Sequence, residues 1–183
     1  DYTLLAADDE QQRLGIDALH LAWQVAPGWS LVSVVTRGFT PNLVAQGALP
    51  PNRETADRPR GGDVAIRLDH AGDRFDGAIS WYRGHNRFAR YGSVFDASGG
   101  LLFRSAHERA TTLGADFSTT VLRWGVRGEY AHTRLAPVCD VCPGTPRSND
   151  RWVLGIDRDL GDSANLNLSW FSIRRPGYVD PNS

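Results

Sequence analysis

Residues 62–85 read GDVAIRLDHAGDRFDGAISWYRGH, and this stretch decides the fold. Val64, Ile66 and Leu68 alternate with polar or small residues, and after a Gly-Asp turn the alternation resumes over residues 75–85. A period of two residues places neighbouring side chains on opposite faces of a β-strand. The stretch therefore predicts a β-hairpin with one apolar face and one polar face.

The same period recurs along the whole chain. The expected strands cover residues 14–25, 29–39, 62–70, 75–85, 110–120, 123–134, 151–159 and 165–174. Short turns near Pro27, Gly72, Val121 and Gly161 alternate with long loops at 40–61, 86–108 and 135–150. Such alternation is typical of bacterial outer-membrane barrels. We therefore expect an all-β, antiparallel, up-and-down transmembrane β-barrel, or a segment of one, with about eight strands.

The composition of the long loops argues against further strands within them. The loop at 40–61 contains Pro41, Pro50, Pro51 and Pro59, and proline removes a donor from a sheet ladder. The loop at 86–108 is rich in glycine, serine and arginine. Both are expected to be exposed connections.

Length, hydropathy and charge exclude several classes of protein. The chain has 183 residues, 22% of them charged, and a mean hydropathy of -0.36. No run reaches the ~18 apolar residues of a membrane-spanning helix. The net charge of -1, without a basic stripe, argues against a nucleic-acid partner. Because the chain lacks methionine and a leader at Asp1, residues 1–183 are expected to form one barrel domain that is incomplete at its N-terminus.

The two cysteines, Cys139 and Cys142, lie in a loop with proline and aspartate neighbours. Their C-x-x-C spacing admits a redox pair, half of a zinc site or a loop disulfide. No second pair of ligands accompanies them, so a complete local zinc site is not expected. Redox motifs of this spacing normally open a helix, and the loop setting therefore favours a structural disulfide.

Short motifs rich in glycine and aromatic residues run along most of the chain. They are DYT at 1–3, ALHLAW at 18–23, GWSL at 28–31, FTPN at 39–42, GADF at 114–117, GVRGE at 125–129 and GIDR at 155–158. These motifs resemble a large family of Gram-negative outer-membrane porin-like β-barrels of unassigned function. The resemblance implies location in the bacterial outer membrane, contact with its lipid and a barrel wider than this chain. The chain departs from that family by lacking earlier strands and by ending at Ser183 without a terminal aromatic residue.

The polar face of the expected strands carries many charged side chains. An arginine facing lipid at the bilayer midplane costs about 2–4 kcal/mol, so this face is expected to look into the lumen or a polar core. The lumen-facing candidates are Arg67, Asp69, Asp116, Arg123, Arg127, Glu129 and Asp157. They predict either a salt-bridged wall or a charged constriction that orients a solute. Aromatic girdles are expected at the lipid boundaries, with members Trp29, Tyr82, Tyr130 and Trp152.

The function expected from this architecture and resemblance is a porin-like channel for passive or facilitated passage of a small, amphipathic or hydrophobic solute. No Gly-x-Ser-x-Gly elbow or other catalytic spacing is present, so neither enzymatic activity nor a cofactor is expected. The five histidines stand singly and are expected to be water-exposed residues of strand ends and loops, with no metal site. Two alternatives remain. One is a non-transporting surface or structural barrel that binds a partner through its long loops, and the other is a soluble ligand-binding β-barrel.

Overall fold

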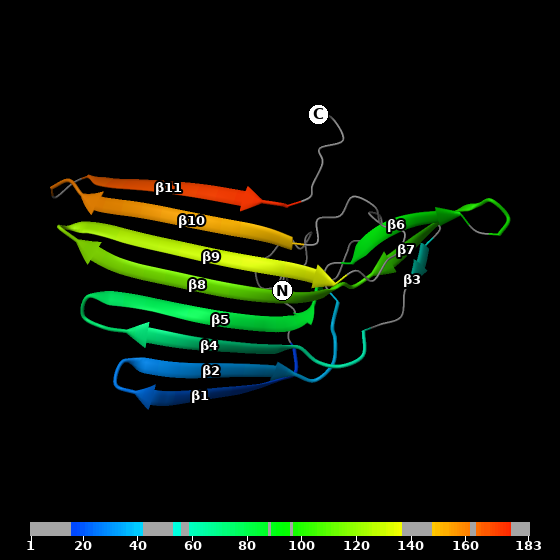
Figure 1. Ribbon diagram of the computed structural model, residues 1–183, viewed down its shortest axis with the longest axis horizontal. Helices are drawn as coiled ribbons and strands as arrows, with labels where there is room; N and C mark the ends of the chain where they lie inside the picture. The colour runs from blue at the N-terminus through cyan, green and yellow to red at the C-terminus, as the bar shows by residue number, and fades with distance from the viewer. Residues whose placement is uncertain are drawn as a thin grey trace.

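The computed structural model describes residues 16–41, 53–55, 59–87, 89–95, 97–136, 148–161 and 164–176. In this part of the chain, no helix is long and apolar enough to cross a membrane. The strands are β1 (Ala18–Ala26), β2 (Trp29–Thr36), β3 (Arg53–Thr55), β4 (Val64–Ala71), β5 (Phe75–His85), β6 (Arg90–Phe95), β7 (Leu101–Ala106), β8 (Arg109–Val121), β9 (Trp124–Ala136), β10 (Ser148–Asp159) and β11 (Asn165–Arg174) (Figure 1).

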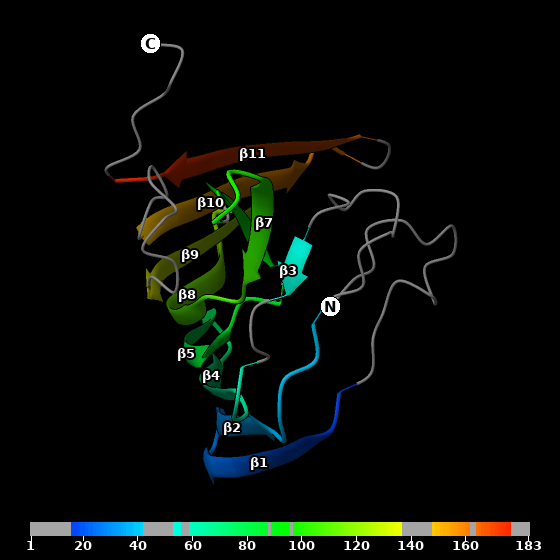
Figure 2. The same ribbon diagram turned by 90° about the vertical axis from the view of Figure 1, so that its right-hand side faces the viewer.

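Eight of these strands form one antiparallel, up-and-down sheet in the order β1-β2-β4-β5-β8-β9-β10-β11. The sheet is open, with β1 and β11 at its edges, and it bends into an arc (Figure 2). Short turns join the strands at one end of the sheet, and the longer connections lie at the other (Figure 1). We call these the short-turn end and the long-loop end. The expected all-β, up-and-down architecture with eight strands is confirmed, in the form of an unclosed segment.

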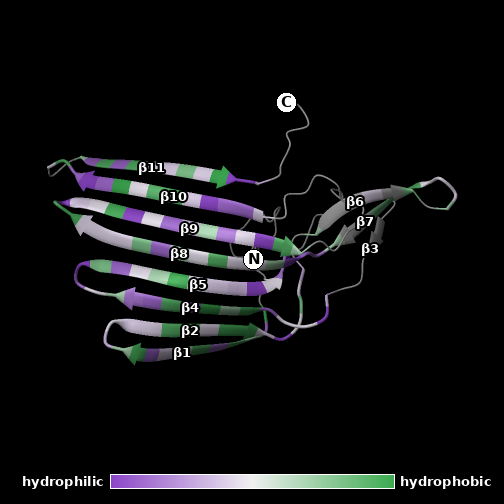
Figure 3. Ribbon diagram, viewed as in Figure 1, coloured by the Kyte–Doolittle hydropathy of each residue, from purple (hydrophilic) through white to green (hydrophobic). Residues whose placement is uncertain are grey.

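Cross-strand register gives this sheet two unlike faces. Leu68 pairs with Ile79, Ile79 with Ala115 and Ala115 with Tyr130, so these side chains share an apolar face. The neighbouring positions, such as Arg67 and Asp116, belong to the opposite, polar face. Hydropathy accordingly alternates along each strand (Figure 3). The alternation expected from the sequence is therefore present in the fold.

The apolar face is exposed. Ile79 retains 62% of its accessible surface, Leu19 retains 61% and Trp23 retains 66%. Among the described residues the only buried hydrophobic side chains are Ala78 and Ala110, and both lie on the polar face. The most buried apolar residues are thus small ones on the polar face, whereas large side chains such as Ile79, Leu19 and Trp23 stand exposed on the apolar face.

The tight turns keep neighbouring strands in register. Gly28 follows Pro27 and has a φ of 74°, a left-handed conformation that glycine adopts without strain. Leu122 and Arg123 also have positive φ values, 50° and 68°, between β8 and β9. Two successive left-handed residues match the twist of a β-hairpin. Arg123 therefore lies in a turn, and its expected place within a strand is wrong.

The long connections contain strands that the sequence did not indicate. β6 and β7 form a hairpin within residues 86–108, and β3 pairs with β7 in parallel (Figure 1). The prolines of the loop at 40–61 flank the three-residue β3 and leave its ladder uninterrupted. The expectation that both loops lack a sheet ladder is therefore wrong.

Several strand boundaries differ from those expected. β1 begins at Ala18, and β2 ends at Thr36, where the chain turns through Gly38 at a φ of 87°. β10 begins at Ser148, three residues earlier than its alternation indicates. Cys139 and Cys142, and hence the expected disulfide, lie outside the described residues.

Candidate functional site

Residues of the polar face line a cavity of about 720 Å³ near the long-loop end of the sheet. Its lining comes from strands β2, β4, β5, β8, β9 and β10, together with flanking residues. Val34, Ala65 and Leu135 supply apolar surface, whereas Arg151 and Arg175 supply exposed positive charge. Within the described residues, the side-chain oxygen of Asn149 is buried without a hydrogen-bond partner. The cavity therefore combines an apolar wall with cationic and hydrogen-bonding groups.

Arg67 is the centre of one charge cluster on the polar face. Its Nε donates to Asp69 at 2.6 Å, and its two terminal nitrogens donate to Asp116 at 2.8 and 3.2 Å. Arg67 lies on β4 and Asp116 on β8, so the guanidinium reaches across β5. The register places Ala78 between Asp69 and Asp116. Because the side chain of Ala78 is small, the bidentate contact can span the intervening strand.

A second, looser cluster joins β9 to β10 and β11. Arg127 lies 3.8 Å from Asp157 and donates to Asn167 at 3.4 Å. Its side chain crosses Gly155, where an added Cβ would stand 2.8 Å from the arginine Nε. Because Gly155 has no side chain, Arg127 can lie flat against the sheet at this position.

The structure brings most of the predicted polar residues together, in two separate groups. Arg67, Asp69 and Asp116 form the first group, and Arg127 with Asp157 forms the second. Glu129 faces the same side beside Asp116 in register, but it forms no ion pair with another described residue.

The most buried charges lie at the long-loop rim of the cavity. Asp63 has a side chain only 3% exposed, and it accepts hydrogen bonds from the backbone N–H of His85 at 3.0 Å and from Arg87 at 3.5 Å. The His85 ring nitrogen Nδ1 lies 3.2 Å from the same carboxylate. His85 is therefore buried, and the expectation of a water-exposed histidine is wrong at this position. His85 is buried because the end of β5 packs against the start of β4, which brings it beside Asp63, 22 positions earlier in the sequence.

Gly62 and Thr36 fix the position of Asp63. The Asp63 N–H donates to the Thr36 hydroxyl at 2.8 Å, and the Thr36 N–H donates to the Asp63 carbonyl at 2.9 Å. A Cβ at Gly62 would overlap the Thr36 carbonyl oxygen, so only glycine permits this approach. The Gly61-Gly62 pair before a strand is the one signal in the sequence that could have drawn attention to Asp63.

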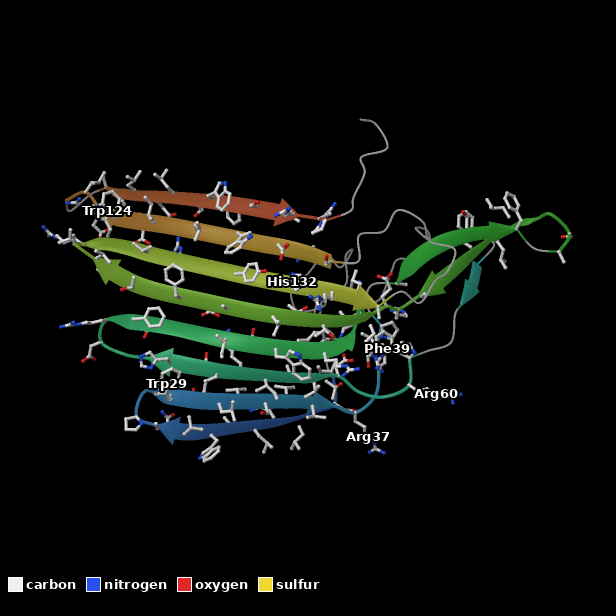
Figure 4. The ribbon with its side chains drawn as sticks, viewed as in Figure 1. Trp29, Arg37, Phe39, Arg60, Trp124 and His132 are labelled. Atoms are coloured by element: carbon white, nitrogen blue, oxygen red, sulfur yellow. The ribbon has the colours of Figure 1, made fainter. Side chains whose placement is uncertain are left out.

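Aromatic rings complete the rim. Phe39, after β2, packs edge-on against His107 at 4.6 Å and against His85 at 5.7 Å between ring centroids (Figure 4). Tyr82 lines the cavity on the polar face, so its expected place in an aromatic girdle is wrong. Trp29, Tyr130 and Trp152 lie on the apolar face as expected. Successive side chains of a β-strand point to opposite faces. Tyr82 directly follows Trp81 in β5, so it must point away from the apolar face that Trp81 occupies.

The described residues contain no group of three or more side chains that could hold a metal ion. No protein-family model matches the chain, and no curated protein matches its sequence. The geometry of the two faces therefore carries the functional argument.

The two charge clusters differ in contact geometry, and we predict that they differ in strength. In a double-mutant cycle, Arg67→Met with Asp116→Asn should give a coupling of about 1 kcal/mol, because the bidentate pair is close but partly exposed. The matched cycle of Arg127→Met with Asp157→Asn should give less than about 0.5 kcal/mol at its longer separation. Urea titration of each variant measures both couplings. Equal values would contradict the contacts described above.

Proposed function

We propose that this chain forms part of the wall of a bacterial outer-membrane, porin-like barrel that passes a small, amphipathic or hydrophobic solute. The apolar outside of the sheet would meet lipid, and the polar inside would line the path of the solute. The observation that carries this proposal is the exposure of large apolar side chains over one continuous face.

Exposure of that face argues for an apolar environment. A water-soluble β-sheet buries its hydrophobic face against a second layer, such as another sheet or helices. Here Leu21, Ile79, Leu113 and Trp170 keep 54–62% of their accessible surface. A soluble ligand-binding barrel would instead place such side chains in its interior. Hydrocarbon is the environment in which this face is stable.

The aromatic residues of the apolar face support a membrane boundary at each end. Trp29 and Trp124 lie at the short-turn end (Figure 4). Trp81 and Trp152 lie four residues from the long-loop ends of β5 and β10, and the ring of Trp152 is 4.2 Å from that of Tyr130, which stands midway along β9. Aromatic girdles at both lipid–water boundaries are a feature of outer-membrane barrels. Six residues separate Phe75 from Trp81 along β5, about 20 Å at 3.3 Å per residue.

The cavity chemistry supports an amphipathic solute. The apolar wall near Val34, Ala65 and Leu135 suits a hydrocarbon segment. Arg151 and Arg175 suit a carboxylate, and the unpartnered Asn149 oxygen suits a hydroxyl or N–H donor. A solute with one polar end and one apolar end would satisfy both parts.

A pair of tryptophan substitutions tests the proposed path. Ala65→Trp places a bulky ring in the cavity, whereas Leu113→Trp places the same ring on the exposed apolar face. The full-length protein in phospholipid vesicles should give passage of short-chain carboxylic acids, measured by vesicle swelling. We expect Ala65→Trp to slow passage at least severalfold and Leu113→Trp to leave it unchanged. Passage that is absent in the wild type, or equally affected by both variants, would refute the proposal.

One observation favours a second function, the binding of a partner at the cell surface. The β3-β7-β6 sheet gives the long-loop end an ordered extension beyond the main sheet (Figure 1). Ordered loops on a rigid scaffold are common binding elements. A barrel that binds a partner in this way and blocks its lumen would show no swelling in the same assay.

A further inference from the structure

Two arginines of the polar face have carboxylate partners that a group of arginines on the apolar face lacks. Arg67 and Arg127, on the polar face, lie beside carboxylates of the same sheet. Five exposed arginines at the long-loop end of the apolar face form no ion pair with any described residue. These residues, which we call the arginine rim, are Arg37, Arg83, Arg109, Arg134 and Arg174.

Register places the members of the rim on the apolar face. Arg83 follows Trp81 by two residues, and both Arg83 and Arg134 pair with Thr111. The backbone N–H of Arg37 donates to Asp17, which continues the β1–β2 ladder beyond Val35. Arg37 and the neighbouring Arg60 project away from the long-loop end of the sheet (Figure 4). The rim thus lies just beyond the aromatic girdle that includes Trp81.

The rim is densest around Thr111. Arg83 and Arg134 stand on the two strands that flank it, about 10 Å apart at 4.8 Å per strand spacing. Arg109 lies on the same face two residues along β8. Arg134 also donates to the His132 ring at 3.2 Å, which directs its side chain along β9. Three arginines on adjacent strands therefore stand at positions next to Thr111.

Acidic neighbours do not neutralise this group. Asp150 is engaged by Tyr130 at 2.8 Å and by His132 at 2.7 Å, and Arg174 of the rim lies opposite it in register and interacts with it electrostatically. Asp17 lies at the other edge of the sheet, on the far side of β2 and β4. At the short-turn end of the same face, by contrast, Arg158 stacks on Trp124 at 5.0 Å from its ring centroid. Arg83, Arg109 and Arg134 thus have no acidic partner among the described residues.

We infer that the arginine rim binds the phosphate groups of lipid headgroups in the leaflet at the long-loop end. Guanidinium pairs bidentately with phosphate, and a ring of unpaired arginines beside an aromatic girdle matches the depth of a headgroup layer. This inference rests on the proposed lipid contact of the apolar face. It adds the chemistry of the partner, a phosphorylated lipid, and assigns it to one end of the sheet.

Quenching by brominated lipids tests the inference, because Trp81 and Trp152 lie near the rim. The full-length protein is reconstituted in phosphatidylcholine, and tryptophan quenching by brominated phosphatidic acid is compared with quenching by brominated phosphatidylcholine. We expect phosphatidic acid to be preferred about fivefold or more at low salt. One arginine beside an anionic leaflet strengthens binding by about the free energy that corresponds to a fivefold change in affinity. High salt should weaken the preference.

The matched variants are R83Q/R134Q at the rim and R74Q/R123Q in the short turns. The rim variant should lose most of the preference, and the turn variant should keep it. Equal quenching by both lipids in the wild type, or loss in both variants, would overturn the inference while leaving membrane contact intact. Loss of the preference on addition of inorganic phosphate would identify a free-anion site and overturn the lipid assignment. No quenching by either lipid would refute the proposed membrane function itself.

Discussion

Leu154→Arg should strongly impair folding of the protein into phospholipid vesicles. Leu154 lies in the middle of β10 on the apolar face and keeps 44% of its surface exposed. An arginine there would face acyl chains, at a cost of about 2–4 kcal/mol near the bilayer midplane. The free energy of unfolding in vesicles, measured by urea titration with tryptophan fluorescence, should fall by that amount.

The neighbouring residue provides the matched control. Val153 lies on the polar face, where it pairs with Glu129 in register. Val153→Arg introduces the same charge next to a carboxylate and the cavity side of the sheet, and we expect a loss below about 1 kcal/mol. Similar losses for the two variants would show that the faces do not meet different environments. The assignment of the apolar face to lipid would then be wrong.

Asp63→Ala should be the most destabilising substitution of a charged residue on this sheet. It removes the acceptor for the His85 N–H and the counter-charge of Arg87 at a position only 3% exposed. Breaking a buried ion pair by removing one partner costs about 3–5 kcal/mol. The midpoint of urea unfolding should shift accordingly, and Asp63→Asn should recover part of the loss because its oxygen still accepts the N–H.

Asp69→Ala is the control for burial. Asp69 also pairs with an arginine, at 2.6 Å, but its side chain is 33% exposed. Water can solvate the remaining Arg67, which keeps Asp116 as a partner, so the loss should stay below about 1 kcal/mol. If both alanine variants lose the same stability, the buried cluster of Asp63, His85 and Arg87 does not hold β4 and β5 together in the manner described.

The hairpins of the main sheet could be predicted from the sequence because their signals are local. Alternation between Phe75 and His85 sets two faces, and the short connections allow only antiparallel neighbours. The bounds of β5 and β11 agree with their expected ranges. The parallel pairing of β3 with β7 could not be predicted, because its partners are separated by about fifty residues and neither has a long alternating run.

The candidate site shows the same division. Alternation alone placed Arg67, Asp69, Asp116, Arg127 and Asp157 on a common face. Which of them meet depended on cross-strand register and on the small residues between them. The buried position of Asp63 depended on the close approach of Gly62 to Thr36. Sequence spacing carries no information on such contacts.

The sequence by itself determined that the chain forms β-strands with one apolar and one polar face, because a two-residue period follows directly from strand geometry. Only the tertiary structure decided that Arg67 reaches Asp116 across β5, that His85 is buried against Asp63 and that Arg83, Arg109 and Arg134 lie around Thr111. The physical reason is that register and curvature arise from the whole sheet, which brings together side chains that lie far apart along the chain.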